Sequence, residues 1–288
     1  MRYRGRTFGE AELELIRGLI ARHPSAHRLA LSRLVSDCLQ WRGADGRLKD
    51  AACRMAMLAM SRDGLIQLPE RARPAGNSRK PWGERTLDGE PGAPIDGRVS
   101  ELEGLRVSLV EGKAESRLWN ELIDRYHYLG YKRQGGAQMR YLVRTSCGRI
   151  VACLGFSAAA WKARARDVWI GWSAESRERR LHLVVNNARF LILPWVKVPH
   201  LASKLLSLAA RRLPREWEAR YGYRPLLLET FVDQARFKGT CYRAANWMHV
   251  GETTGRGRYD TRHAAHGKSV KSVWIYPLDQ RAQAKLAE

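Results

Sequence analysis

Cysteines, acidic residues and long apolar runs are all scarce in this sequence. The five cysteines, Cys38, Cys53, Cys147, Cys153 and Cys241, form no CxxC pair. A disulfide framework and a cysteine-rich zinc site are therefore not expected, and we predict small buried thiols in a reducing compartment. No run of about 18 apolar residues occurs, so no membrane span is expected. The basic N-terminus leads into no apolar signal segment, which favours a cytoplasmic location.

The shortage of acidic residues leaves the chain strongly basic. Lysine and arginine number 51 against 29 aspartates and glutamates, a formal net charge of +22. Hydrophobic residues make up 44% of the chain, enough to build a core, which excludes a disordered basic tail protein. The expected partner of such a protein is nucleic acid. The alternative is a ribosome-associated or merely basic protein.

A change in composition divides the chain into two domains. Residues 71–100 are rich in proline, glycine and polar side chains and are predicted to be a linker. The linker separates a domain over 1–70 from a larger one over 101–288. The net charges of the three parts are +4 for 1–70, +2 for 71–100 and +16 for 101–288, so most of the charge is on the larger domain.

The smaller domain has the pattern of a winged helix-turn-helix. Apolar spacing predicts helices over 10–21, 29–39 and 50–61, and a short strand over 65–68 follows a turn. The third helix of such a domain enters the major groove, so Lys49, Arg54 and Arg62 are predicted to contact DNA. Since many winged helices bind protein instead, a dimerisation or scaffolding module is the alternative.

The larger domain is predicted to be an α/β domain with a mixed central sheet, which makes the whole chain α+β. The expected helices cover residues 116–128, 201–213 and 240–246. The expected strands cover residues 139–144, 149–158, 168–172, 182–185, 189–193, 225–232, 248–253 and 273–276.

This order of elements resembles the Gcn5-related N-acyltransferase fold. Residues 189–194 with the helix that follows, and residues 241–251, carry the resemblance. It implies acyl-CoA as a cofactor and Tyr242 as a proton donor to a leaving thiolate. The cofactor would bind at Val196, Lys197, Val198, Ala202 and Ser203.

Longer motifs are similar to the Druantia A-type family. The resemblance covers nearly all of 101–278, and the motifs that carry it lie at 125–131, 183–194, 228–233, 237–247 and 255–258. The resemblance implies a DNA-directed role in an anti-phage defence system or beside a transposase. It fixes no reaction.

Acidic residues are candidates for catalysis. Glu229 and Asp233 alternate along one predicted strand and should share a face. With Asp167 they could hold a divalent metal ion or share acid–base work. Equally, the carboxylates could neutralise arginines such as Arg236 or Arg243. Tyr242 could instead stack on a base or be a core tyrosine.

Basic and aromatic residues are interleaved in the larger domain, as is typical of binding to single-stranded DNA or to a flipped base. The alternative is that the tryptophans are core residues and the asparagines form turns. The predicted nucleic-acid-binding residues of this domain are Lys162, Arg164, Arg166, Trp169, Asn187, Arg189, Arg243, Asn246, Arg256 and Arg258.

Three functions are compatible with these patterns. The first is a DNA-modifying transferase with Tyr242 as acid and Glu229 or Asp233 as base. The second is a metal-dependent nuclease or transposition factor that uses Asp167, Glu229 and Asp233. The third is a non-catalytic DNA-recognition subunit for a helicase or transposase. In the first, the winged helix would dock duplex DNA. The distribution of charge makes the larger domain a principal DNA-contacting surface, with the winged helix as a helper or a specificity device.

Overall fold

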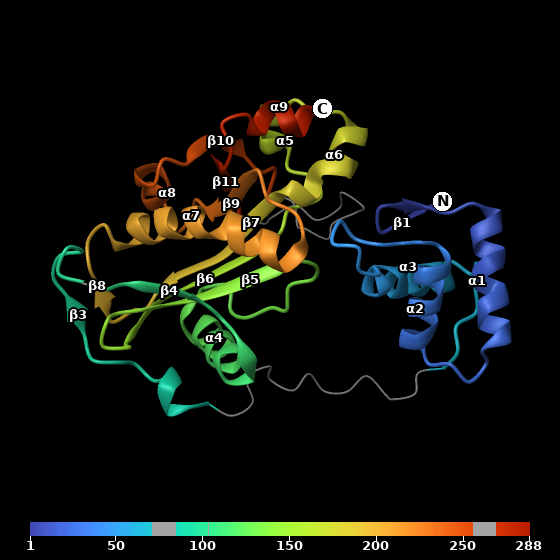
Figure 1. Ribbon diagram of the computed structural model, residues 1–288, viewed down its shortest axis with the longest axis horizontal. Coiled ribbons are helices and arrows are strands. Elements are labelled where there is room, and N and C mark those ends of the chain that lie inside the picture. The colour runs from blue at the N-terminus through green and yellow to red at the C-terminus, as the bar shows by residue number, and fades with distance from the viewer. Residues whose placement is uncertain (71–84, 103, 256–268) are drawn as a thin grey trace. The chain divides into compact units, whose positions relative to one another are not determined.

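The computed structural model describes residues 1–70, 85–102, 104–255 and 269–288 (Figure 1). Two predicted DNA contacts, Arg256 and Arg258, lie outside these residues. The chain forms two compact units, Met1–Ser78 and Arg79–Glu288. Within the described residues, no helix combines the length and the apolar character needed to cross a membrane.

The first unit is built from the three predicted helices. They are α1 (Glu10–Arg22), α2 (Arg28–Cys38) and α3 (Asp50–Arg62), preceded by a hairpin of β1 (Arg2–Tyr3) and β2 (Arg6–Thr7). The core contains Phe8, Leu13, Ile16, Leu31, Val35, Trp41, Met57 and Met60.

The predicted strand over 65–68 is absent from the first unit. The Leu65 N–H bonds back to the Met60 carbonyl and ends α3, and Ile66 packs into the helical core. The winged arrangement therefore stays a prediction.

A seven-stranded mixed sheet forms the centre of the second unit. Its order is β4-β5-β6-β7-β9-β11-β10, with β7 and β9 parallel and every other pair antiparallel. The strands are β4 (Arg106–Leu109), β5 (Gln138–Arg144), β6 (Ile150–Ala158), β7 (Val184–Ile192), β9 (Leu227–Asp233), β10 (Met248–Glu252) and β11 (Lys271–Pro277). This confirms the predicted α+β class.

Helices cover both faces of the sheet. Figure 1 shows α4 (Gly112–Tyr126) on one face and α7 (Leu201–Tyr221) on the other. Shorter helices of this unit include α5 (Arg164–Ile170), α6 (Ala174–Arg180), η2 (Leu181–Leu183), α8 (Thr240–Ala244) and α9 (Ala282–Ala287). A second apolar cluster, which contains Ile170, Leu227, Ile275 and Leu286, joins the sheet to α5, η2 and α9.

The predicted strand over 168–172 is wrong, because these residues belong to α5 and the turn that ends it. Arg166 and Ile170, four residues apart, are both buried, whereas Val168 is 73% exposed. The burial thus follows the helical period, and Gly171 ends the helix with a left-handed φ of 75°.

The two strands predicted over 182–193 are in fact one strand, β7. The polar residues that interrupt the apolar run, Asn186, Asn187 and Arg189, are buried within the continuous strand. Of the cysteines, Cys38 and Cys147 are exposed, which corrects their predicted burial, and all five are free thiols.

The second half of the predicted linker belongs to the second unit. Residues 85–102, here called the strap, contain η1 (Leu87–Gly89) and β3 (Ile95–Asp96), which pairs in parallel with β8 (Val196–Lys197). Ile95 is buried in the core of the unit. One well-placed isoleucine and backbone pairing anchor a segment whose composition alone predicts a linker.

Candidate functional site

The central feature of the second unit is the place where β7 and β9 separate. The two strands pair at only three positions, from Val184 opposite Leu227 to Asn186 opposite Glu229. Beyond these, β7 continues beside β6 and β9 continues beside β11. We call this opening the strand fork.

Three polar side chains close the strand fork. The Tyr242 hydroxyl donates to Asn187 Oδ1 at 2.9 Å, and the Thr230 hydroxyl donates to the Asn187 carbonyl at 3.0 Å. Asn187 Nδ2 donates to the carbonyls of Gly155 and Arg189 at 3.3 and 3.2 Å. Asn187 therefore has no free group with which to read a base edge, which corrects its predicted role.

Burial sets the chemistry of Tyr242. Its side chain is packed among Phe190 and Trp247, and burial raises the pKa of the phenol well above its ordinary value. The hydroxyl is therefore protonated at neutral pH, but its proton is already donated to Asn187. Tyr242 is therefore a core tyrosine, as the alternative interpretation predicted.

We expect Tyr242→Phe to lower the free energy of unfolding by about 1–2 kcal/mol, because Asn187 Oδ1 would lose its donor in a buried site. Urea denaturation measures this change. Tyr276→Phe is the matched control, since Tyr276 also packs on Trp247 but is only half-buried, so water can replace its hydroxyl; it should cost less than about 0.5 kcal/mol. Equal costs for the two variants would contradict the assigned hydrogen bond.

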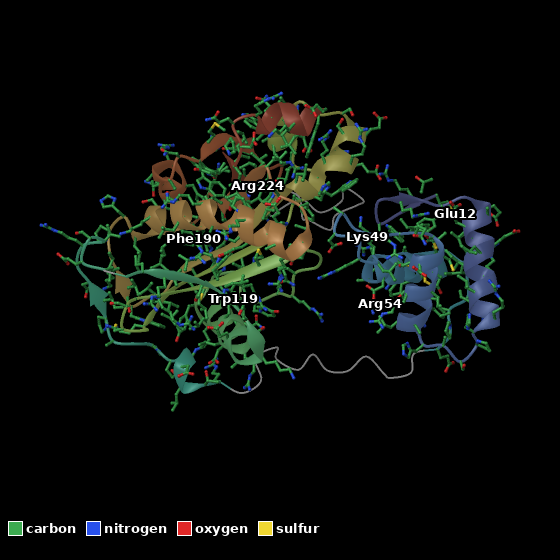
Figure 2. All side chains as sticks on the ribbon, viewed as in Figure 1. Glu12, Lys49, Arg54, Trp119, Phe190 and Arg224 are labelled. Carbon is green, nitrogen blue, oxygen red and sulfur yellow. The ribbon has the colours of Figure 1, made fainter. Side chains whose placement is uncertain are left out.

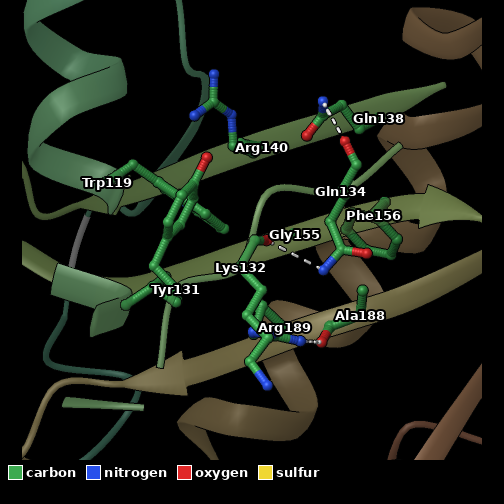
Figure 3. A pocket seen from close by; sticks show the side chains of 11 residues that line it. Trp119, Tyr131, Lys132, Gln134, Gln138, Arg140, Gly155, Phe156, Ala188 and Arg189 are labelled. Atoms are coloured by element: carbon green, nitrogen blue, oxygen red, sulfur yellow. Dashed lines mark hydrogen bonds between the residues drawn. The ribbon is translucent and has the colours of Figure 1, made fainter. Parts of the chain in front are cut away.

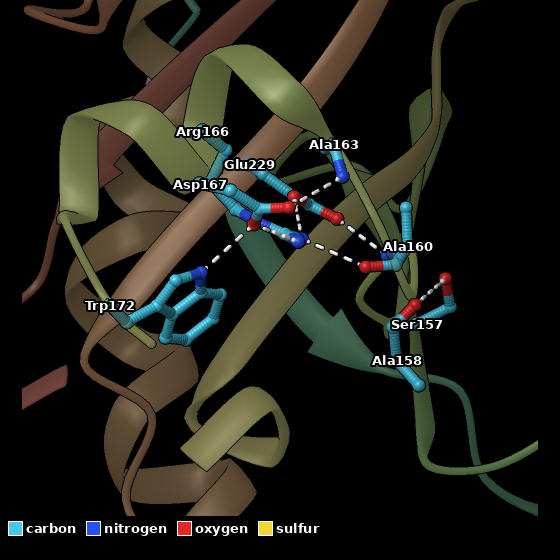
Figure 4. Close-up of polar contacts among 8 residues, drawn as sticks. All are labelled: Ser157, Ala158, Ala160, Ala163, Arg166, Asp167, Trp172 and Glu229. Carbon is cyan, nitrogen blue, oxygen red and sulfur yellow. Dashed lines mark hydrogen bonds and ion pairs between the residues drawn. The ribbon is translucent and has the colours of Figure 1, made fainter. Parts of the chain in front are cut away.

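A second buried network surrounds Arg166, on α5 (Figure 4). Arg166 is 0% exposed, and its Nη1 donates to Glu229 Oε2 at 2.7 Å and to the Ala160 carbonyl at 2.9 Å. Its Nη2 and Nε donate to Asp167 Oδ1 at 2.6 and 2.9 Å. Burial alone would lower the pKa of Arg166, but the charges of Glu229 and Asp167 outweigh it and raise that pKa.

The carboxylates of this network have further donors. The Ala160 N–H donates to Glu229 Oε1 at 2.7 Å, and Asp167 accepts from the Ala163 N–H at 3.1 Å and from Trp172 Nε1 at 3.1 Å. Glu229 and Asp167 thus neutralise a buried arginine, as the alternative predicted. The arginine is Arg166, however, and not Arg236 or Arg243. The predicted DNA contact at Arg166 is wrong in this structure, because the guanidinium is enclosed and fully bonded.

The predicted acid–base pair is not assembled. Thr230 faces Tyr242, so the neighbouring Glu229 points to the opposite face of β9, where it meets Arg166. Among the described residues, no group of three or more histidine, cysteine, aspartate or glutamate side chains is placed to hold a metal ion. The oxygens of Asp167 and Glu229 already hold a guanidinium, so this donor set does not fit a divalent cation.

Asp233 shapes the turn between β9 and α8. Its Oδ1 accepts from the Ala235 N–H at 3.2 Å, its Oδ2 from the Ser269 hydroxyl at 3.0 Å, and its carbonyl from the Phe237 N–H at 2.9 Å. These bonds hold Asp233, predicted as a base or metal ligand, in a structural position.

The β9–α8 turn presents exposed residues beside the strand fork. Phe237 is 52% exposed, and its ring packs on Tyr128 with centroids 5.5 Å apart. The Arg236 guanidinium lies 5.1 Å from the centre of the Tyr128 ring. We call Tyr128, Arg236, Phe237 and Lys238 the turn cluster. None of these residues is among the predicted DNA contacts, and Arg236 is predicted only as a possible partner of a carboxylate. An aromatic residue between two cations after a buried strand is nevertheless a recognisable signal.

The loop after α4 extends this surface. Arg189 Nε donates to the Gly130 carbonyl at 3.3 Å, and Lys132 lines a narrow pocket with Arg189, Trp119 and Tyr131 (Figure 3). Gly155 also lines the pocket, and a Cβ there would lie 2.9 Å from the Trp119 ring.

The histidine of the same loop does not add to the positive charge at neutral pH. Burial, followed by the charge of Arg189, lowers the pKa of His127 to about 4, so the imidazole is neutral at pH 7. His127 Nδ1 instead accepts from the Leu129 N–H at 3.2 Å. The positive charge beside the strand fork therefore comes from lysine and arginine.

The predicted cofactor loop does not fit the pyrophosphate of acyl-CoA. Val196 and Lys197 are paired with the strap, and the Lys204 ammonium donates to the strap carbonyl of Val99 at 3.5 Å. The loop has no glycine, and Pro199 offers no N–H. The remaining predicted residues, Val198, Ala202 and Ser203, are half-buried at the start of α7.

The other predicted DNA contacts fall in separate places. On α3, Arg54 is half-buried, while Lys49 and Arg62 at its two ends are exposed (Figure 2 labels Lys49 and Arg54). On and beside α5, Lys162 and Arg164 are exposed and Trp169 is half-buried. Asn246 is exposed with a left-handed φ of 62°, as expected of a turn former. Arg243 is exposed and stacks on Trp274 at 5.8 Å.

Solved structures to which the chain is similar include acetyltransferases. The spermidine N-acetyltransferase of Vibrio cholerae in complex with CoA and spermine is 10% identical, over 64% of this chain and 98% of its own, with a TM-score of 0.40. A spermidine/spermine N-acetyltransferase of the same organism with manganese ions is 9% identical over 60% and 92%, with a TM-score of 0.39. A nourseothricin acetyltransferase is 13% identical over 49% and 66%, with a TM-score of 0.30.

The family is shown by sequence. The family model described as Druantia protein DruA matches residues 59–284, which span the end of α3 and nearly all of the second unit. The chain therefore belongs to the DruA family of the multi-protein Druantia anti-phage defence system. No curated protein matches the chain.

Proposed function

We propose that this DruA-family protein is a DNA-binding component of the defence system and that its second unit contacts DNA beside the strand fork. The observation that carries the proposal is the set of exposed cations on the β9–α8 turn and α8. Arg236, Lys238 and Arg243 form no ion pair with a carboxylate of the described residues. Cations left without acidic partners attract phosphates, and the chain as a whole has a net charge of +22.

In this proposal the four residues predicted to be catalytic support the fold. Tyr242 closes the strand fork, Glu229 and Asp167 hold Arg166, and Asp233 holds the turn that presents the cations. Base modification and strand cleavage are therefore not part of the proposed role. The function that the geometry supports best is DNA recognition.

The first unit is proposed as a helper in duplex binding. Lys49 and Arg62, at the two ends of α3, are both exposed and free of ion pairs within the described residues. A helix that enters the major groove contacts base edges from its N-terminal residues, which favours Lys49 as the closer contact.

Fluorescence anisotropy with the full chain and labelled DNA tests the proposal. We expect the double charge reversal Arg236→Glu and Lys238→Glu to raise the Kd by about tenfold at low salt and to make the salt dependence less steep. The matched control is Arg211→Glu and Arg215→Glu, two exposed arginines on α7, with an identical change of net charge. Equal losses for the two double variants, or no loss from the first, would refute the proposed surface.

A further inference from the structure

The Phe237 side chain is held outward on the β9–α8 turn, away from the core. Its exposed fraction is 52%, whereas the rings of Tyr242 on α8 and Trp274 on β11 are buried. Resting on the DNA-binding role proposed above, we infer that Phe237 stacks on an unpaired base, so the turn cluster recognises single-stranded DNA.

The turn that carries Phe237 is fixed at both ends. At its start, Asp233 accepts from the backbone N–H groups of Ala235 and Phe237. At its end, Gly239 has a left-handed φ of 71°, and its Cα lies so close to Trp274 that a Cβ would be 2.7 Å from the ring. The backbone on both sides of Phe237 is thus fixed, and its ring rests on Tyr128. A ring held in this way loses little entropy when a base stacks on it.

The groups around Phe237 match the chemistry of a nucleotide. A ring stacks on the face of a base, and neighbouring cations meet the phosphates on either side of that base. Arg236 precedes the ring and Lys238 follows it, and both are exposed. Tyr128 supports the ring from the side through their contact of 5.5 Å.

The arrangement favours single strands because of the geometry of stacking. Inside a duplex, both faces of each base are covered by the neighbouring bases, so an exposed ring finds no free face. An unpaired base has a free face on which an aromatic ring can stack. The cations bind both forms of DNA, and Phe237 therefore adds affinity for the single strand only.

Anisotropy with the full chain and three labelled oligonucleotides tests the inference. They are a thymine single strand, an abasic single strand of equal length and charge, and a duplex. We expect Phe237→Ala to weaken binding of the thymine strand by about tenfold and to leave binding of the abasic strand and the duplex unchanged. Phe237→Trp should keep the affinity for the thymine strand, because an aromatic face is retained.

Leu87→Ala is the control, since Leu87 is a 90% exposed apolar residue of the strap, and it should change none of the three affinities. An equal loss by Phe237→Ala on all three oligonucleotides, or no loss on the thymine strand, would overturn the inference. Failure of the unaltered protein to bind any DNA would instead refute the proposed function. The two failures are thereby distinguished.

Discussion

Arg166→Met is expected to lower the free energy of unfolding by about 3–5 kcal/mol, because it removes one partner of a fully buried ion pair. Arg166 and Glu229 are both 0% exposed, and Glu229 would be left charged in the interior without a cation. Methionine keeps much of the volume of the arginine stem, so the loss of stability comes mainly from the missing positive charge. Urea denaturation, followed through the unfolding of the second unit, measures this loss of stability.

Two further variants make this result specific. Arg164→Met changes an exposed arginine on the same helix and should cost less than about 0.5 kcal/mol. Adding Glu229→Gln to Arg166→Met should restore part of the stability, because the uncompensated charge is removed and the amide oxygen can still accept from the Ala160 N–H. If Arg166→Met is no more costly than Arg164→Met, the buried network does not stabilise the fold.

Gly239→Ala is expected to lower the free energy of unfolding by about 2–5 kcal/mol, for two separable reasons. A left-handed φ strains any residue with a Cβ by roughly 1–2 kcal/mol. In addition, the new methyl group would lie 2.7–2.9 Å from three atoms of the Trp274 ring, and such overpacking costs about 1–3 kcal/mol. Thermal unfolding would show the loss.

Gly222→Ala is a control that separates the backbone strain from the contact with Trp274. Gly222 ends α7 with a φ of 75°, but nothing lies within 4 Å of a Cβ placed there. It should therefore show the strain alone, about 1–2 kcal/mol. A loss at Gly239 no larger than that at Gly222 would show that Trp274 yields to the methyl group and does not fix the turn.

Local patterns in the sequence predict much of the fold. The helices of the first unit follow from the spacing of residues such as Leu13, Ile16 and Leu19. Spacing also predicts that Glu229 and Asp233 share one face of a strand. Both residues do belong to one strand, β9. In these places each residue's environment is set by near neighbours in the chain.

The roles of the charged residues could not be predicted in the same way. Arg166 stands in a run of basic residues and looks like its exposed neighbour Arg164. Its burial depends on Glu229, 63 residues further on, which only the folded sheet brings to it. Asn187 is similar, since the donor to its side chain, Tyr242, is 55 residues away.

Phe237 is the converse case, an apolar residue that the structure leaves exposed. In the sequence it resembles any apolar residue between a strand and a helix, and the pattern predicts no role for it. Its exposure results from the Asp233 bonds and the Gly239 conformation, which together direct the turn outward. The residue type was visible in the sequence, but the direction of its side chain was not.

The three-position contact between β7 and β9 also bears on how the second unit folds. Each antiparallel set, β4 to β7 and β9 to β11, joins strands that are close in the chain order. The parallel contact between the sets requires the whole crossover through α7 before any of its hydrogen bonds can form, and its loop-closure entropy is correspondingly large. The two halves of the sheet can therefore acquire structure independently, and their joining at the strand fork is the step that commits the unit to its native topology.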